Sequence, residues 1–571
     1  MSFNRLYNIL KPHQKYIVDK VIKSYSNNDY FFISAPTGSG KTLTTLTIIK
    51  YLQENNYINK VLWFTRTHNE FYPVIRDVNK FDIPLNVSPI VGKLKACRNP
   101  LKVMTHFFEL VDVCQYCKTK DYIADRLIPQ KYRELMSVDA LVKSIAPTLC
   151  PYNTLLASSI YADIILLTYP YLLGAPRKKL DNALNYDLIV IDEAHNVENI
   201  PQILAMNLSL HSLHTLKANG YNVSSLIELH DNVLGNEKMK YVSKELFKGA
   251  LIHVDRKVFT HCMDLISISN YTSEHVVKSL AELCSFMNAI DYKFFDIYAT
   301  RYGFRLMVTD PYEIISNLFT TKTIFMSGSL PSYEYIKNVW GIDGLYIDIE
   351  TEINFKFGER KWFIADDVTT KLVLRSKYID TYKEYLMKLL KTAKPVVLVV
   401  FPSYEFMSRF TDIAKHYECI IEHEEGTKIE EVINKVINEN IKCIYAVAGG
   451  RLTEGIEVTK DSKSLIKTII MVGVPYPEPS EYLTKKTEKL LKRIRLNSEL
   501  KYRYLFHEPA KILTKQAIGR GIRHEEDVNI ILLLDWRYKH FITDLNIDKF
   551  TYITVGKKKD ETKIKKIDLN D

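Results

Sequence analysis

Short, continuous apolar runs recur along the chain, and polar residues follow each of them. In the first part of the chain these runs are 30–34, 61–64, 164–167, 188–191 and 323–326. In the second part they are 396–401, 443–447, 469–472 and 530–534. A strand that is buried on both faces of a parallel sheet has this continuous pattern rather than an alternating one. The pattern therefore predicts an α/β protein with two doubly wound parallel sheets.

Two further segments fit neither sheet, and we expect them to be insertions. Residues 92–152 contain four cysteines, and residues 206–300 are poor in strand-like runs and have apolar positions at helical spacing. The predicted divisions are a first sheet domain at 1–91, 153–205 and 301–340, a second at 341–571, and insertions at 92–152 and 206–300.

A glycine-containing loop follows the first apolar run, with Ala35 at the position of the usual first glycine. In a phosphate loop, backbone N–H groups at a helix start bind the phosphates, the lysine binds the β/γ oxygens and the hydroxyl contacts Mg²⁺. We therefore expect Lys41 to be catalytic and Thr42 to bind the metal. The expected ATP-binding residues of the loop are Thr37, Gly38, Ser39, Gly40, Lys41 and Thr42.

Acidic residues follow the run at 188–191. Asp192 is expected to hold Mg²⁺, and Glu193 to orient or deprotonate the attacking water. His195 is interpreted as a link between the nucleotide site and neighbouring motifs rather than as a chemical group; a purely structural role is the alternative.

A third motif, Gln516 to Arg523, lies late in the second sheet domain. Arg520 and Arg523 are three residues apart, so on a helix they share one face and can reach a cleft together. Arginine from a second domain can stabilise charge on the transferring phosphoryl group, which makes hydrolysis depend on domain closure. Solvated surface arginines are the alternative.

The cysteines are the most unusual feature of this nucleotide-binding pattern. Cys97, Cys114, Cys117 and Cys150 lie between the phosphate loop and Asp192, and four thiolates suit either zinc or an iron–sulfur cluster. The spacing alone leaves both open, with unliganded cysteines as a third reading. We expect the other four to be unpaired, buried side chains rather than disulfides: Cys262, Cys284, Cys419 and Cys443.

Composition adds less. The net charge is +10, which favours a polyanionic partner but equally fits a lysine-rich surface. No apolar stretch approaches the roughly 18 residues of a membrane helix, and no apolar signal region follows Met1. These features predict a cytoplasmic protein without a membrane partner.

Taken together, the motifs resemble those of the XPD helicases, which are superfamily 2 DNA helicases, and the resemblance covers nearly the whole chain. The motifs that carry it, in chain order, are the phosphate loop, TRTHNE at 65–70, the four cysteines, DEAH at 192–195, SGS at 327–329, GGRLTEG at 449–455 and QAIGRGIR at 516–523. The chain is most similar to the compact archaeal members.

The resemblance implies two RecA-like motor domains, a [4Fe–4S] cluster on the four cysteines in 92–152 and a helical arch in 206–300. It also implies ATP-dependent 5′→3′ movement along single-stranded DNA, forked or overhang duplexes as substrates, repair proteins as partners in nucleotide excision repair, and a monomer. Roles implied by position are the adenine side of ATP for Gln14, ATP contact for Glu454, and DNA contact or coupling for Arg66, His68, His195, Ser327 and Ser329.

Two other functions compete with this one. The chain could be an ATP-driven scaffold or remodeller whose DNA binding regulates a partner. It could also be a redox-responsive sensor of DNA damage. The presence of Lys41, Asp192, Glu193 and Arg520 argues against an inactive scaffold.

Overall fold

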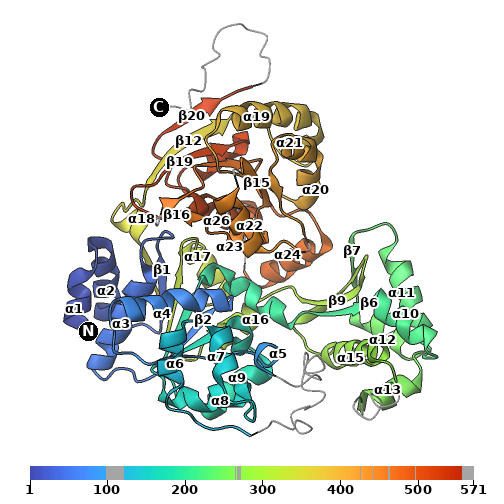
Figure 1. Cartoon of the computed structure of the whole chain (residues 1–571). Coiled ribbons are helices and arrows are strands. Elements are labelled where there is room, and N and C mark those ends of the chain that lie inside the picture. Colours follow the sequence, from blue (N-terminus) through green and yellow to red (C-terminus); the bar gives the residue numbers. More distant parts are fainter. Residues whose placement is uncertain are drawn as a thin grey trace.

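Two seven-stranded parallel sheets form the body of the protein (Figure 1). The computed structural model describes residues 1–555 except 98–120, 264, 266–271, 425, 440, 461–462 and 495–496. Both expected sheets are therefore confirmed, one above the other in the view of Figure 1.

The first sheet has the strand order β11-β1-β10-β5-β2-β4-β3. Its strands are β1 (Tyr30–Ser34), β2 (Val61–Thr65), β3 (Val87–Pro89), β4 (Ile164–Thr168), β5 (Leu188–Asp192), β10 (Thr323–Ser327) and β11 (Leu345–Asp348). The helices of this domain include α1 (Phe3–Ile9), α2 (Pro12–Ser24), α3 (Lys41–Glu54), α4 (Phe71–Lys80), α9 (Gly174–Ala183), α16 (Tyr312–Leu318) and α18 (Ile349–Glu352). Strand β11 pairs with β1, so the first sheet continues past residue 340.

The second sheet has the order β14-β15-β13-β18-β19-β12-β20. Its strands are β12 (Glu359–Ala365), β13 (Val397–Phe401), β14 (Ile420–Ile421), β15 (Cys443–Val447), β18 (Thr468–Met471), β19 (Val528–Leu533) and β20 (Phe550–Ile553). Its helices include α19 (Ile379–Thr392), α20 (Tyr404–Met407), α21 (Thr411–His416), α22 (Ile429–Asn438), α23 (Arg451–Gly455), α24 (Glu481–Arg493), α25 (Ser498–Tyr502) and α26 (Glu508–Ile518). Separate apolar clusters cover its two faces.

The segment 206–300 is not purely helical. Its helices are α10 (Leu210–Ala218), α11 (Ser224–Leu234), α12 (Lys244–Leu251), α13 (Arg256–Met263) and α15 (Glu274–Ala289). An antiparallel sheet of order β6-β9-β8-β7 accompanies them, built from β6 (Met206–Ser209), β7 (Met239–Val242), β8 (Phe295–Thr300) and β9 (Gly303–Val308). Helices make up most of the segment, as expected, but the antiparallel sheet was not predicted; β6 and β7 are short and only partly buried and so lack a continuous apolar run.

Four short helices belong to the cysteine segment or border it. They are α5 (Lys93–Ala96), α6 (Ile128–Leu135), α7 (Val138–Ser144) and α8 (Pro151–Ser158). Helices α5 and α8 pack against each other. None of the helices in the described ranges is both long and apolar enough to cross a membrane.

The expectation of unpaired cysteines was wrong for four residues. Cys262 forms a disulfide with Cys284, and Cys419 forms one with Cys443. Packing of α13 against α15 brings the first pair together, and the turn after α21 lies beside β15 in the second. The partners are 22 and 24 residues apart, so the sequence alone did not reveal their proximity.

Helix α24 connects the second sheet domain to the rest of the molecule. It lies between that domain and the antiparallel sheet (Figure 1), with the Lys485 ammonium 4.6 Å from the ring centre of Tyr241 and Lys489 2.5 Å from Asp296. Leu490 on this helix, and Leu505 beyond it, belong to the apolar core of the first sheet domain.

A largely buried ion pair fixes this connection. Lys486 on α24 donates to Glu198, which lies just after the DEAH motif and also accepts from the Tyr335 hydroxyl at 2.6 Å. Burial alone would raise the pKa of Glu198, but the charge of Lys486 and the hydrogen bonds from Lys486 and Tyr335 together outweigh it, and the pKa lies below its ordinary value.

We predict that Lys486→Met lowers the free energy of unfolding by about 3 kcal/mol, because it leaves the Glu198 carboxylate buried without its cation. Thermal unfolding measures the change. Lys492→Met, at an exposed position of the same helix, is the control. Glu198→Leu combined with Lys486→Met is expected to recover much of the loss, and an equally unstable double variant would contradict this account.

Candidate active site

The phosphate loop has the backbone conformation that its sequence requires. Gly38 and Gly40 have φ of +87° and +84°, a region that side chains rarely adopt, and α3 begins directly after Gly40. Lys41 Nζ donates to the carbonyls of Ala35 at 3.1 Å and Pro36 at 3.4 Å. The loop therefore folds around the lysine at the carboxyl end of β1.

Residues of α2 support this loop from behind. Gln14 Nε2 donates to the Ser39 carbonyl at 3.2 Å, and the His13 ring hydrogen-bonds the same oxygen at 2.9 Å. Gln14 Oε1 accepts from the backbone N–H of Lys11 at 2.8 Å. The amide of Gln14 is thus used to hold the loop.

Asp192 and Glu193 lie side by side at the end of β5. Burial, together with the charge of Glu193, raises the pKa of Asp192 well above its ordinary value. For Glu193, burial is outweighed by the hydrogen bond to His195 and the charges of Lys41 and Arg520, so its pKa lies well below the usual range. Two adjacent carboxylates that oppose each other's ionisation favour a cation beside them.

His195 joins the DEAH motif to the end of β10. Its Nδ1 lies 2.7 Å from Ser327 Oγ and 3.3 Å from a carboxylate oxygen of Glu193. Ser327 Oγ also accepts from the Ser329 N–H at 3.1 Å. The linking role expected for His195 therefore has a direct geometric basis.

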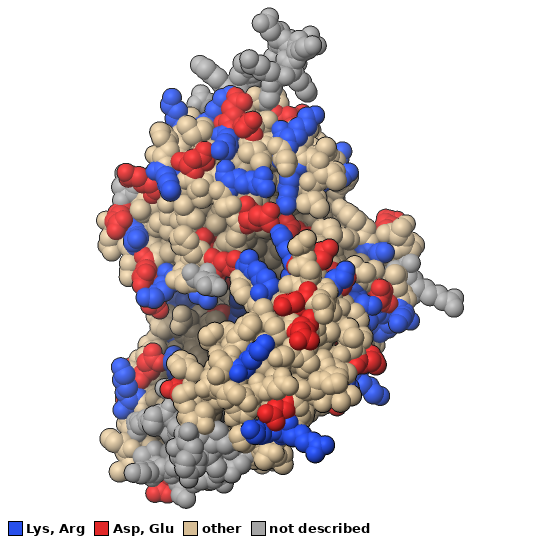
Figure 2. All heavy atoms as spheres, turned by 90° about the vertical axis from the view of Figure 1, so that its right-hand side faces the viewer, with Lys and Arg blue, Asp and Glu red and all other residues tan. Residues whose placement is uncertain are grey.

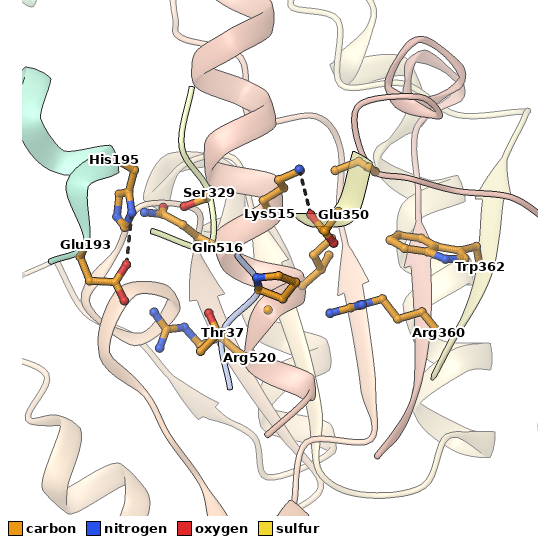
Figure 3. Close-up of a pocket in the computed structure, with 15 residues that line it drawn as sticks. Thr37, Glu193, His195, Ser329, Glu350, Arg360, Trp362, Lys515, Gln516 and Arg520 are labelled. Carbon is orange, nitrogen blue, oxygen red and sulfur yellow. Dashed lines mark hydrogen bonds and ion pairs between the residues drawn. The ribbon is translucent and has the colours of Figure 1, made fainter. Parts of the chain in front are cut away.

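Residues of the second sheet domain complete the cleft. Its lining includes Thr37, Glu193, His195 and Ser329 from the first domain, and Gln516 and Arg520 from the second (Figure 3). Arg520 Nε donates to the Thr453 carbonyl at 2.7 Å, which holds the guanidinium against α23. Its charge contributes to the lowered pKa of Glu193.

Arg523 lies deeper in the second domain. It donates to the Gly519 carbonyl at 2.7 Å and pairs with Glu457 at 3.3 Å. Burial lowers its pKa to about 10. Arg523 does not line the cleft, although it shares the motif with Arg520.

The remaining expected residues, Arg66, His68 and Glu454, lie near the carboxyl end of β2. Arg66 forms an ion pair with Glu454, which joins the two sheet domains directly. Glu454 is thus placed on Arg66 and not in the lining of the cleft. The ring of His68 packs on Phe71, and burial lowers the pKa of His68.

Several residues in and around the cleft belong to none of the sequence motifs. Tyr169 donates to the carbonyls of Asp192 and Glu193, so it supports the catalytic strand end. Glu350, Arg360, Trp362 and Lys515 line the cleft on the side away from Glu193 (Figure 3). For the charged residues among them, the only sequence feature that could have indicated a role is their position near the end of a strand or helix.

Two of the four cysteines that the sequence offers as metal or cluster ligands lie in the described residues. Cys97 follows α5 and Cys150 precedes α8, the two helices that pack together, and neither forms a disulfide. Cys114 and Cys117 lie outside the described residues. Within the described part, no three His, Cys, Asp or Glu residues group as metal ligands.

Comparison with known proteins identifies the family. Family models match as a helicase C-terminal domain over residues 386–545, as DEAD_2 over 63–213 and as the res subunit of type III restriction enzymes over 8–83. The ATP-dependent DNA helicase XPD of Sulfolobus acidocaldarius is 33% identical over 94% of this chain and 98% of its own length.

The chain belongs to the XPD helicase family. A solved XPD helicase structure covers 96% of this chain with 30% identity and a TM-score of 0.76, and an XPD structure titled as the apo form covers 94% with 28% identity and a TM-score of 0.70. A helicase CHL1 of Vanderwaltozyma polyspora is 24% identical over 70% of this chain and 58% of its own length.

For this XPD-family protein we predict that Arg520→Ala lowers the kcat of ATP hydrolysis by about 10³-fold or more, because the guanidinium faces the catalytic carboxylate from the second domain. Steady-state ATPase assays with single-stranded DNA measure the effect. Arg409→Ala, an exposed arginine of the same domain, is the control. A change in KM with unaltered kcat would argue against the proposed placement.

Proposed function

We propose that this protein is an ATP-dependent DNA helicase that translocates 5′→3′ on single-stranded DNA, separates duplex strands and acts in nucleotide excision repair. The observation that carries the proposal is the cleft in which Thr37, Glu193 and His195 of one RecA-like domain face Gln516 and Arg520 of the other. Membership of the XPD family supports DNA as the substrate.

The chemistry at this cleft is hydrolysis of the γ-phosphate of ATP. Lys41 neutralises charge on the β/γ oxygens, and Thr42 and Asp192 would hold Mg²⁺, which balances the phosphate charge when bound. Glu193, ionised and hydrogen-bonded to His195, orients the attacking water and accepts its proton. Arg520 stabilises the developing charge when the domains close.

Coupling to DNA follows from residues that touch both domains. Ser327 connects to His195, so a change at the γ-phosphate reaches the end of β10. Arg66 and Glu454 form an ion pair across the domains, and opening of the cleft separates them. As the cleft alternates between open and closed, the affinity of each domain for the DNA backbone changes.

Charge alone does not mark the path of DNA. Figure 2 shows a hollowed face on which basic and acidic side chains are intermingled, rather than a single basic stripe. Recognition of single strands combines basic residues with stacking aromatic rings, so a net charge of +10 supports the proposal only in part.

A [4Fe–4S] cluster on Cys97, Cys114, Cys117 and Cys150 belongs to the proposal. The donor set is suitable, since four thiolates ligate such clusters, and the packing of α5 against α8 brings the ends that carry Cys97 and Cys150 into one region. When bound, the cluster would cross-link the segment and make it a rigid element beside the DNA.

Polarity is tested with matched duplexes that have either a 5′ or a 3′ single-stranded overhang. We expect ATP-dependent unwinding from the 5′ overhang only, because the strand would be engaged in one direction by the two domains. ATPase activity that DNA stimulates without any strand displacement would instead support the remodeller function.

The cluster is tested by Cys114→Ser. This variant is expected to lose the brown colour and the unwinding activity but to keep part of its ATPase activity, because the two sheet domains have their own cores. Wild-type protein that is colourless and contains one zinc per chain after anaerobic purification would refute the cluster and favour zinc.

A further inference from the structure

Glu422 is a buried carboxylate of the second sheet domain, and it belongs to none of the sequence motifs. It follows β14 directly, and only 1% of the residue is exposed. One carboxylate oxygen accepts from the backbone N–H of Val447 at 2.9 Å, and the other accepts from the N–H of Leu452 at 3.0 Å. A buried charge is costly unless hydrogen bonds replace its hydration, so Glu422 and these N–H groups hold each other in place.

Gly450 shows how closely the backbone surrounds this carboxylate. A Cβ atom at position 450 would lie 2.7 Å from each carboxylate oxygen of Glu422 and 2.9 Å from the Val447 carbonyl oxygen. Any larger side chain here would therefore displace Glu422 or the backbone that it binds. The φ angle of Gly450 is −79°, which every residue can adopt, so the glycine is needed for space and not for its conformation.

The two N–H groups that Glu422 binds belong to different elements. Val447 ends β15, and Leu452 lies in the first turn of α23. The Thr453 hydroxyl donates to the carbonyls of Val447 at 2.7 Å and of Gly450 at 3.0 Å, across the same turn. These contacts fix the position of α23 relative to the second sheet.

The carbonyl groups of α23 in turn hold Arg520. Its Nε donates to the Thr453 carbonyl at 2.7 Å, and its Nη2 donates to the Glu454 carbonyl at 2.5 Å. Figure 3 shows the Arg520 guanidinium near Glu193. The position of this guanidinium therefore depends on carbonyl groups whose own position depends on Glu422.

Glu422 itself does not line the cleft, so an effect on the chemistry there has to pass through α23. The Tyr404 hydroxyl is a further hydrogen-bond partner of the carboxylate. Burial, together with the charge of Glu422, raises the pKa of Tyr404 to about 12, so this hydroxyl keeps its proton near neutral pH.

We propose that Glu422 is a positioning residue for ATP hydrolysis. Its hydrogen bonds to Val447 and Leu452 fix α23, and α23 fixes the guanidinium of Arg520. The inference rests on the proposed ATPase function, in which Arg520 stabilises the charge that develops on the phosphoryl group. It adds a residue that controls the rate without contact with the nucleotide.

Steady-state ATPase assays of the full chain with saturating single-stranded DNA test the effect of Glu422→Gln. The glutamine amide has one acceptor oxygen, and its NH₂ group would face the second N–H donor, so α23 is displaced. We expect kcat to fall about 10²-fold, the order of loss that a misplacement of about 1 Å produces. The KM for ATP is expected to change little, because Arg520 acts in the transition state. Glu430→Gln, at an exposed position of α22, is the control and is expected to leave kcat unchanged.

A double-mutant cycle separates positioning from a general loss of structure. In the Arg520→Ala background, Glu422→Gln is expected to cause little further loss of kcat, because the guanidinium that it positions is absent. A smaller fraction of folded protein would instead lower kcat by the same factor in both backgrounds, and this result would overturn the inference. An unchanged kcat in Glu422→Gln alone would overturn it as well.

Gly450→Ala gives an independent reading should Glu422→Gln fold poorly. It keeps the carboxylate but places a Cβ atom against it, so the same loss of kcat is expected, and again little further loss in the Arg520→Ala background. Equal factors in both backgrounds would contradict the role of Glu422.

The variants also separate this inference from the function on which it rests. Retained turnover in Lys41→Ala, or an unchanged kcat in Arg520→Ala, would overturn the ATPase proposal itself. Loss of turnover in both of these variants, together with an unchanged kcat in Glu422→Gln, would overturn only the role of Glu422.

Discussion

The two sheet domains are held together by packing that does not depend on a nucleotide. Helix α24 is part of the second domain in sequence, yet Leu490 and Leu505 lie in the core of the first. The pair Lys486–Glu198 lies within this contact, and neither charge is well solvated. Because an unpaired buried charge is costly, this contact opposes complete separation of the domains.

This contact between the domains keeps residues of the second sheet domain close to the cleft in the first. Gln516 and Arg520 approach Glu193 and Ser329 because the end of α26 and the turn after it face the carboxyl ends of the strands of the first sheet. Glu198 lies on η6 (Ala194–Leu204), which begins directly after Asp192 and Glu193. The carboxylate that pairs with Lys486 and the two carboxylates of the cleft therefore belong to one continuous stretch of chain. A displacement of Asp192 or Glu193 would therefore also displace the segment that carries Glu198.

The residues at the two ends of the cleft differ in how far the sequence pointed to them. Lys41, Asp192, Glu193 and Arg520 belong to motifs whose spacing follows from phosphate chemistry, and the structure brings Lys41, Glu193 and Arg520 within electrostatic reach. Arg360 and Glu350 belong to no such motif. Glu350 enters the cleft because β11 pairs with β1, and Arg360 because β12 begins at the domain boundary.

The sequence by itself determined the two parallel sheets, since continuous apolar runs report strands buried on both faces, and it determined the phosphate loop, since Gly38 and Gly40 are needed for its positive φ angles. Only the tertiary structure decided the pairing of β11 with β1, the antiparallel sheet of β6 to β9, the two disulfides, the Arg66–Glu454 pair and the packing of α24 into the first domain. Each of these joins residues far apart in the chain, or strands too short and exposed for a periodic signal. The local pattern of apolar residues shows that a segment is buried, but it does not show which other segment covers it.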